Sequence, residues 1–177
     1  GVSVRKWQNL GSDFETQIAN ACDYAYEKYG YYTVFLPMQS SRDTAIMQNI
    51  KRKMKHESAI IKKRYSVEGM LSIIKCFDMC IGMRLHTLIY AAINSVPLIG
   101  LVYDPKINSF MEYTHQRHYV DVNEVPDENL KKMLDECVAN YDTIKQDLKE
   151  NYSHLKEKAK LNGKYAIELY EKGSVTL

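Results

Sequence analysis

An arginine and a histidine stand two residues apart in the stretch IGMRLHTLIYAA, residues 81–92. Arg84 carries a planar fork of N–H donors that matches a carboxylate or a phosphate, so it suits the binding of an anion. His86 can give or take a proton near neutral pH, so it suits general acid–base catalysis. An apolar run ends at Gly82, and apolar residues at helical spacing begin just after the pair. The pair therefore lies where a buried strand meets a buried helix.

Each of these two residues also has a purely structural interpretation. Arg84 could form a salt bridge on the exposed side of the helix, and a lone histidine in an apolar helix is more often a core residue than a catalytic one. Residues two apart within a regular helix do not face one another. Both side chains can therefore serve one site only if Arg84 lies in the turn and His86 lies in the first helical turn.

The segments that must position this pair alternate between short β-rich runs and helical patterns. We expect strands at residues 2–5, 32–36, 59–61, 77–81, 98–103 and 118–122, and helices at about 13–29, 42–55, 67–75, 84–94 and 105–113. Such alternation with short connections predicts an α/β fold with a doubly wound parallel sheet, Rossmann-like, with helices on both faces. The strands are continuous apolar runs, as is typical of strands covered on both sides.

The helices carry their own signals. Ser12 followed three residues later by Glu15 predicts a capping box at the start of the first helix. After Pro126, apolar residues recur at helical spacing. We therefore expect residues 126–177 to form a long helical segment, two helices with an interruption at Gly163, packed on the lobe formed by residues 1–125.

Ligands of open parallel sheets bind beyond the carboxyl ends of the strands. The residues at these ends are therefore the candidates for a binding site: Arg5, Gln39, Asp43, Gly82, Arg84, His86, Tyr103, Asp104 and Lys106. Several of them are cations, and a helix N-terminus adds partial positive charge at the same edge, so the arrangement predicts an anionic ligand. Asp104, Asp43 and Lys106 also fit structural roles, as a helix cap, a first-turn carboxylate and a solvated surface cation.

The composition excludes several classes of protein. Apolar residues make up 45% and charged residues 26% of the 177-residue chain, which is typical of a globular protein. A net charge of +2 gives no reason to expect a nucleic-acid partner, and no glycine-rich phosphate loop occurs. No apolar stretch approaches the roughly 18 residues of a transmembrane helix.

The four cysteines, at positions 22, 76, 80 and 137, give no metal-site signature. Two of them are four residues apart, but no second Cys/His pair at ligand spacing accompanies them. Three of them lie in apolar patterns. We therefore expect reduced thiols, with no zinc and no disulfide.

Residues 51–64, KRKMKHESAIIKKR, form the most basic stretch of the chain. Such a stretch could attract an anionic lipid surface or a substrate that carries pyrophosphate. A solvated helix end followed by a strand is the favoured interpretation, since exposed helix ends are commonly charged.

Residues 77–111, FDMCIGMRLHTLIYAAINSVPLIGLVYDPKINSFM, resemble the C-terminal half of the polysaccharide pyruvyl transferase family. The motifs that carry the resemblance are Arg84-Leu85-His86, Val96-Pro97 and Tyr103-Asp104-Pro105-Lys106. SVRKW at 3–7 is similar to the family's S-x-R-x-W strand end, with Lys6 where proline is expected, and FLPMQSSRD at 35–43 matches its Pro-x-x…Asp loop. The bacterial branch that adds pyruvate ketals to N-acetylmannosamine of cell-wall polymers is the most similar.

This resemblance implies the C-terminal lobe of a two-lobed fold like that of the glycosyltransferase-B enzymes, with the N-terminal lobe outside this chain. It implies transfer of the enolpyruvyl unit of phosphoenolpyruvate to two hydroxyls of a sugar, with release of phosphate and no metal or other cofactor. Arg5 and Arg84 would clamp phosphoenolpyruvate, with Gln39 beside them. Lys106 would neutralise the departing phosphate, and His86 would shuttle protons. A lipid-linked acceptor would place the protein in the cytoplasm, at the inner face of the membrane.

Two other functions stay open at this point. A sugar-nucleotide glycosyltransferase or epimerase would share the lobe architecture and would need a carboxylate for the ribose, for which Asp121 and Glu124 are candidates. Alternatively, the isolated lobe would bind a ligand without turnover, because half of the crevice wall would belong to the other lobe.

Overall fold

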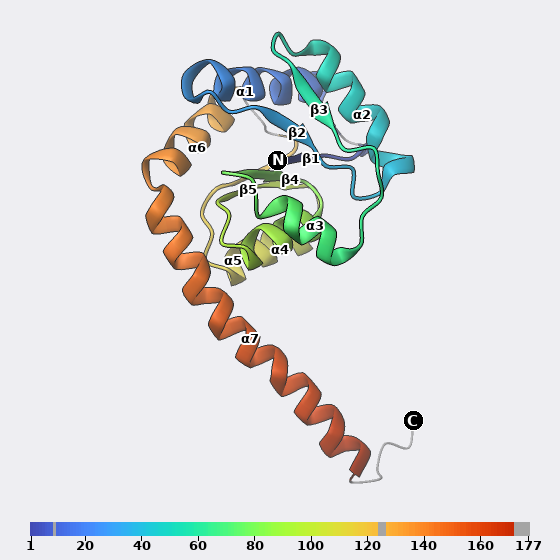
Figure 1. The fold of residues 1–177 in the computed structure, drawn as a ribbon, viewed down its shortest axis with the longest axis vertical. Coiled ribbons are helices and arrows are strands. Elements are labelled where there is room, and N and C mark those ends of the chain that lie inside the picture. Colours follow the sequence, from blue (N-terminus) through green and yellow to red (C-terminus); the bar gives the residue numbers. More distant parts are fainter. Residues whose placement is uncertain (9, 124–126, 172–177) are drawn as a thin grey trace.

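A parallel sheet forms the centre of the molecule (Figure 1). The computed structural model describes residues 1–8, 10–123 and 127–171. These residues form six strands: β1 (Val2–Ser3), β2 (Thr33–Phe35), β3 (Ser58–Ile60), β4 (Cys80–Gly82), β5 (Leu98–Val102) and β6 (Tyr119–Asp121). All neighbours are parallel, in the order β3-β2-β1-β4-β5-β6. The order reverses between β1 and β4, so the predicted doubly wound, Rossmann-like fold is confirmed.

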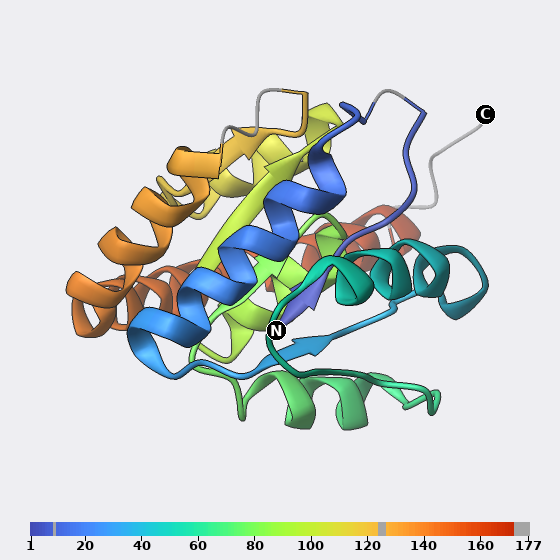
Figure 2. The ribbon, with the colours of Figure 1, turned by 90° about the horizontal axis from the view of Figure 1, so that it is seen from above.

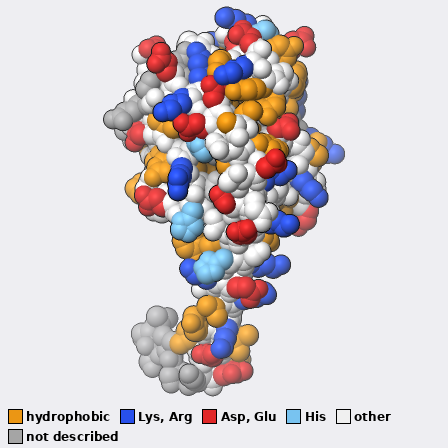
Figure 3. All heavy atoms as spheres, turned by 90° about the vertical axis from the view of Figure 1, so that its left-hand side faces the viewer, with side chains coloured by type: hydrophobic (Ala, Val, Ile, Leu, Met, Phe, Trp, Pro, Cys, Tyr) orange, Lys and Arg blue, Asp and Glu red, His pale blue; other side chains and the backbone are white. Residues whose placement is uncertain are grey.

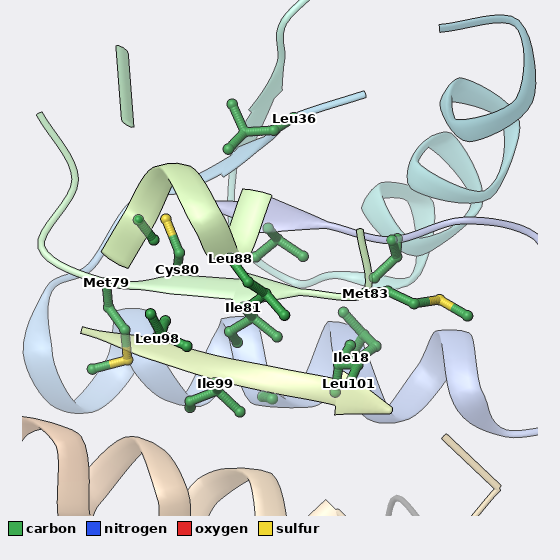
Figure 4. Close-up of a cluster of buried hydrophobic side chains, with 14 of the residues drawn as sticks. Ile18, Leu36, Met79, Cys80, Ile81, Met83, Leu88, Leu98, Ile99 and Leu101 are labelled. Atoms are coloured by element: carbon green, nitrogen blue, oxygen red, sulfur yellow. The ribbon is translucent and has the colours of Figure 1, made fainter. Parts of the chain in front are cut away.

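Helices cover both faces of the sheet (Figure 2). On one face α1 (Phe14–Tyr29) contacts both α2 (Ser40–Lys53) and α6 (Asp127–Ala139). On the other face α4 (Leu85–Ile93) contacts both α3 (Val67–Ile74) and α5 (Pro105–Tyr113). Figure 4 shows apolar side chains of the sheet packed with helix side chains: Ile81, Leu98, Ile99, Ile18 of α1 and Leu88 of α4. This two-sided burial explains why the strands read as continuous apolar runs.

The first helix does not begin with the predicted capping box. Its N-cap residue is Asp13, one residue later than predicted, and no side-chain cap hydrogen bond forms there. The carboxylate of Glu15 instead faces α2, where it accepts a hydrogen bond from Asn49 Nδ2 at 3.0 Å and lies 3.5 Å from Lys53 Nζ. A contact between two helices thus uses the side chain that the box would have required.

The fourth strand begins later than predicted. The N–H of Phe77 donates to the carbonyl of Ile74 at 3.1 Å, so this segment still belongs to the turn that closes α3. Pairing with β5 starts only at Cys80. The apolar run of the sequence therefore spans a helix end and a strand, which apolar content alone does not separate.

The last helix, α7 (Tyr141–Glu171), runs through Gly163, so the predicted interruption there is wrong. No atom lies within 4 Å of the place where a Cβ of Gly163 would be. A glycine in a helix interior costs roughly 0.5–1 kcal/mol relative to alanine, which weakens a helix without ending it. The first part of α7 packs on α4 and buries Ile144 and Leu148, whereas the second part projects from the body (Figure 1, Figure 3). None of the helices in the described part of the chain combines the length and the apolar content that crossing a membrane requires.

Candidate functional site

The two arginines predicted to bind an anion lie at neighbouring strand ends. β1 pairs with β4 so that Ser3 lies opposite Gly82. Arg5 and Arg84 each follow two residues later. The N–H of Met83 donates to the carbonyl of Ser3 at 2.7 Å, which continues the ladder toward the two arginines. The strand order reverses at this pair of strands, and ligands of doubly wound sheets bind at such a point.

The turn between β4 and α4 depends on Gly82. A Cβ at this position would lie 2.6 Å from Leu88 Cδ2, so only glycine lets α4 pack this closely on the strand. Arg84 is the N-cap residue of α4, with φ −90° and ψ 122°, and His86 lies in the first helical turn. The pair therefore meets the geometric condition for sharing one site, and Gly82 contributes to it through packing.

A buried carboxylate holds the guanidinium of Arg84. Arg84 Nε donates to Asp43 Oδ2 at 3.1 Å and Nη2 donates to Asp43 Oδ1 at 2.5 Å, while Nη2 also donates to Gln39 Oε1 at 3.3 Å. The side chain of Asp43 is fully buried and that of Arg84 is 15% exposed. Asp43 also accepts a hydrogen bond from the backbone N–H of Gln39 at 2.8 Å. Arg84 thus forms a salt bridge, as the structural alternative predicted. Its partner, however, is a buried carboxylate of α2 and not a residue on the exposed side of α4.

The imidazole of His86 is exposed, so its interpretation as a core histidine is wrong. The ring lies near that of Tyr90, one turn further along α4, with 6.2 Å between centroids and 63° between planes. No described residue forms a hydrogen bond with the imidazole. An exposed imidazole that has no hydrogen bond with a described residue is free to exchange a proton with a ligand.

Aromatic rings, rather than a carboxylate, hold the guanidinium of Arg5. Its Cζ lies 5.4 Å from the ring centroid of Trp7 and 5.3 Å from that of Tyr103, and its Nη1 donates to Tyr103 Oη at 3.2 Å. The two rings are 4.8 Å apart and inclined at 59°. Arg5 Nε is buried and has no hydrogen-bond partner among the described residues. Cation–π attraction thus fixes Arg5 without using most of its donors.

Trp7 follows β1 at the edge of the sheet where ligands are expected, and it is the tryptophan of the S-x-R-x-W resemblance. It is the only tryptophan of the chain. The sequence indicated its place at the strand end but not its contact with Arg5. The contact itself depends on Tyr103, which is remote in sequence.

Asp104 and Lys106 form a local pair at the start of α5. Asp104 Oδ1 accepts a hydrogen bond from the backbone N–H of Lys106 at 3.0 Å, and Oδ2 lies 3.2 Å from Lys106 Nζ. The backbone hydrogen bond lowers the pKa of the Asp104 carboxyl most strongly, followed by the Lys106 side chain. Lys106 Nζ also lies 5.7 Å from the Tyr103 ring centroid. The pair therefore adjoins the aromatic cage that Trp7 and Tyr103 form around Arg5. Asp104 is a helix cap, and the ammonium of Lys106 is already paired.

Residues 5–105 match the family model of the polysaccharide pyruvyl transferases. The chain belongs to this family. The match spans more than half of the chain and includes Arg5, Arg84 and His86, and it ends just before Lys106. No curated protein matches the chain.

A solved structure with a similar fold is that of the N-terminal domain of Candida albicans trehalose-6-phosphate phosphatase. The sequence identity is 15% and the TM-score is 0.50, over 86% of this chain and 37% of that chain. At this identity the likeness shows the fold alone. The pyruvyl transferase family chain described here corresponds to little more than a third of that domain's length.

The carboxylates considered for a ribose lie at or beyond the last strand. Asp121 ends β6, and its Oδ1 accepts a hydrogen bond from the N–H of Asn123 at 2.8 Å. Two strands, β4 and β5, separate β6 from β1. Glu124 lies outside the described residues. Asp121 therefore lies two strands away from the β1–β4 strand ends that carry Arg5 and Arg84 in this family member.

Three of the four thiols of this pyruvyl transferase family chain are packed in the interior. Cys22, Cys80 and Cys137 are buried and Cys76 is exposed. Burial raises the pKa of the Cys22 thiol to about 11 and that of the Cys137 thiol to about 12, so both stay protonated at neutral pH. Within the ranges that the structure describes, no group of three or more His, Cys, Asp or Glu side chains could hold a metal ion.

Proposed function

We propose that this chain is the donor-binding lobe of an enzyme that transfers the pyruvyl unit of phosphoenolpyruvate to two hydroxyls of a sugar. The observation that carries the proposal is that Arg5 and Arg84 follow paired positions of β1 and β4 at the switch point, with the exposed His86 in the first turn of α4. Phosphoenolpyruvate has a carboxylate and a phosphate, so it needs two anion-binding groups at one place. An arginine guanidinium donates charge-assisted hydrogen bonds to either group, from Nη1 in the case of Arg84 because Nε and Nη2 are occupied by Asp43 and Gln39.

The reaction requires proton transfer at carbon and at oxygen. Protonation of the methylene carbon makes the neighbouring carbon electrophilic, and the first sugar hydroxyl adds there with loss of its proton. The bond from that carbon to the phosphate oxygen then breaks and phosphate leaves. The second hydroxyl adds to the same carbon and loses its proton, which closes the cyclic ketal. His86 is the group assigned to these proton transfers, with a contribution on the order of 10²–10⁴-fold in rate.

The remaining residues of the site act around this core. Asp43 and Gln39 orient Arg84, and Tyr103 with Trp7 orients Arg5. Lys106, paired with Asp104, stands near the departing phosphate in this proposal. No residue of the chain is assigned to a metal or to another cofactor.

The wider setting is part of the same proposal. In this proposal residues 1–125 form the catalytic lobe, the helices α6 and α7 follow it, and a separate N-terminal lobe of a glycosyltransferase-B-like protein supplies the facing wall. The acceptor is N-acetylmannosamine in a lipid-linked cell-wall precursor, reached from the cytoplasmic face of the membrane. Because the facing wall would carry most of the acceptor contacts, the chain alone is expected to bind the donor and to turn over poorly.

Calorimetric titration of phosphoenolpyruvate tests the proposal. We compare the unchanged chain with Arg84→Ala, His86→Ala and the control Arg117→Ala, which removes an exposed arginine that precedes β6. Binding is expected in the unchanged chain, His86→Ala and Arg117→Ala, and its loss is expected in Arg84→Ala. A folded chain that ignores phosphoenolpyruvate at millimolar concentration contradicts the proposal. Binding of a UDP-sugar in its place would favour the glycosyltransferase or epimerase alternative.

A further inference from the structure

A groove lies next to the proposed donor site. One wall comes from the residues that join β2 to α2, and the other comes from the loop after β3. Its volume is about 460 Å³, and it is lined by Pro37, Met38, Gln39, Ser40, Ser41, Lys63, Arg64, Tyr65 and Met70. Both walls follow carboxyl ends of strands, so the groove lies along the same edge of the sheet as Arg5 and Arg84.

The cations of this groove, Lys63 and Arg64, differ from Lys51 and Lys53 of the same basic stretch. At the end of α2, Lys51 donates to the carbonyl of Ser58, and Lys53 lies 3.5 Å from a carboxylate oxygen of Glu15. Lys63 and Arg64 are exposed, and neither pairs with a carboxylate in the described part of the chain. The ammonium of Lys63 lies 5.8 Å from the ring centroid of Tyr65, which also lines the groove. Lys51 and Lys53 therefore make contacts within the protein, whereas Lys63 and Arg64 line the groove.

Gln39 connects this groove to the donor site. It lines the groove, and its Oε1 accepts the hydrogen bond from Arg84 Nη2 at 3.3 Å. A ligand in the groove is therefore separated from the Arg84 guanidinium by a single side chain. Two substrates that react with one another must bind in such neighbouring positions.

We infer that the groove binds the phosphate or pyrophosphate group of the saccharide acceptor, at a position distinct from phosphoenolpyruvate. The inference rests on the proposed function, because it assigns the second substrate of that reaction. Lys63 and Arg64 supply a point charge and a bidentate fork for phosphate oxygens. Met38 and Met70 give the groove an apolar floor, and Ser40 and Ser41 give it hydroxyls for the polar edge of a sugar. Orthophosphate released by the reaction shares this chemistry, so the experiment must separate the two sources.

The test is calorimetric titration of inorganic pyrophosphate and of orthophosphate into the chain saturated with phosphoenolpyruvate. Pyrophosphate is expected to bind without displacing phosphoenolpyruvate, and more tightly than orthophosphate. The double variant Lys63→Gln, Arg64→Gln is expected to weaken pyrophosphate binding by about tenfold or more, since it removes two charged donors. The matched control Lys55→Gln, Lys75→Gln removes the same charge from exposed positions outside the groove and should bind like the unchanged chain.

Several results would overturn the inference. Pyrophosphate that competes with phosphoenolpyruvate would place both in one site. If both double variants lost the same pyrophosphate affinity, the loss would come from the change in net charge and not from the groove. Orthophosphate that binds as tightly as pyrophosphate would assign the groove to the released product. Failure of the unchanged chain to bind phosphoenolpyruvate is a separate result that overturns the proposed function, whereas its binding together with no pyrophosphate binding overturns only the acceptor groove.

Discussion

Arg84 and Arg5 reach the same edge of the sheet, but opposite kinds of contact hold them. A fully buried carboxylate, Asp43, grips Arg84 through two hydrogen bonds. Two aromatic rings grip Arg5, and among the described residues no carboxylate is paired with it. The carboxylate of Asp43 fixes the orientation of the Arg84 guanidinium but also neutralises its positive charge. The rings of Trp7 and Tyr103 fix the orientation of the Arg5 guanidinium and leave its positive charge in place.

In the proposed function, this difference gives the two arginines different duties. A neutralised but rigid guanidinium offers a fixed direction: Nε and Nη2 of Arg84 are occupied by Asp43 and Gln39, so the N–H groups of Nη1 are the ones left for an anion. A guanidinium between rings offers net positive charge, which attracts an anion and balances the charge of phosphate. A donor with two anionic groups needs both. Variants that act on one holding contact at a time can separate the two duties.

Removal of Arg84 is expected to have the largest effect. Arg84→Met leaves the Asp43 carboxylate buried without its counter-ion, which costs about 3–5 kcal/mol of the free energy of unfolding. Arg5→Met removes a cation–π contact instead, which costs about 2 kcal/mol or less. Urea unfolding of both variants, followed by circular dichroism, measures the difference.

The double variant Arg84→Met, Asp43→Leu separates stability from binding. Apolar replacement of a whole buried ion pair is often neutral, so this chain should regain most of the lost stability. It should still fail to bind phosphoenolpyruvate, because the fork is gone. A double variant as unstable as Arg84→Met alone would show that the uncompensated charge of Asp43 is not the cause.

Substitution of Gly82 should disturb one arginine and spare the other. In Gly82→Ala the new Cβ would lie 2.6 Å from Leu88 Cδ2 and 2.9 Å from Leu88 Cγ, so the buried Leu88 side chain must move, at an expected cost of about 1–3 kcal/mol in the free energy of unfolding. Leu88 belongs to α4, so we expect the strain to displace Arg84 and His86, to leave the rings around Arg5 in place and to weaken the binding of phosphoenolpyruvate. Thermal unfolding and calorimetry on one sample measure both effects.

Gly163→Ala is the matched control for this prediction. It adds the same methyl group where nothing lies within 4 Å, on the projecting part of α7. The change should stabilise the helix by roughly 0.5–1 kcal/mol and leave phosphoenolpyruvate binding unchanged. If phosphoenolpyruvate bound more weakly to both variants, the weaker binding of Gly82→Ala could not be attributed to a displaced α4.

Loss of Trp7 should weaken the grip on Arg5 without affecting Arg84. We expect Trp7→Ala to reduce phosphoenolpyruvate affinity by about tenfold, the worth of one strong cation–π contact, and Trp7→Phe to retain most of it. Arg5 keeps its hydrogen bond to Tyr103 in both variants, so the loss is partial. The measurement is calorimetric titration, and equal losses in the alanine and phenylalanine variants would argue against a stacking role.

The sequence predicted the backbone of this site better than its side-chain contacts. Apolar runs and helical spacing are local signals, and parallel pairing then places Arg5 and Arg84 at one edge. The holding contacts join residues 41 positions apart, in the case of Arg84 with Asp43, and 98 apart, in the case of Arg5 with Tyr103. No local pattern encodes such pairs. The same limit explains the failed capping box, since Glu15 is used by a contact with Asn49 on another helix.

The smallest expected effect concerns Asp104, the carboxylate that lies nearest in sequence to the cage residue Tyr103. Its pKa is lowered mainly by the backbone N–H of Lys106, so the folded chain prefers the carboxylate more than the unfolded chain does. The resulting stabilisation is fully present above the ordinary aspartate pKa, about 4, and is lost as the pH falls through the lower folded value. Asp104→Asn keeps a capping side chain without the charge. Its deficit in Tm relative to the unchanged chain should therefore shrink as the pH is lowered from 7 toward 3.

The same variant distinguishes the duties of the two arginines at pH 7. The positive charge of Arg5 contributes to the lowered pKa of Asp104, so removing the carboxylate charge should strengthen the field of Arg5 on a bound anion. Phosphoenolpyruvate should then bind more tightly by at most about fivefold, the range of an exposed charge pair. The gain should vanish when Asp104→Asn is combined with Arg5→Met. A gain that persists in that combination would mean that the charge on the anion is balanced elsewhere, and the division of duties between the two arginines would not hold.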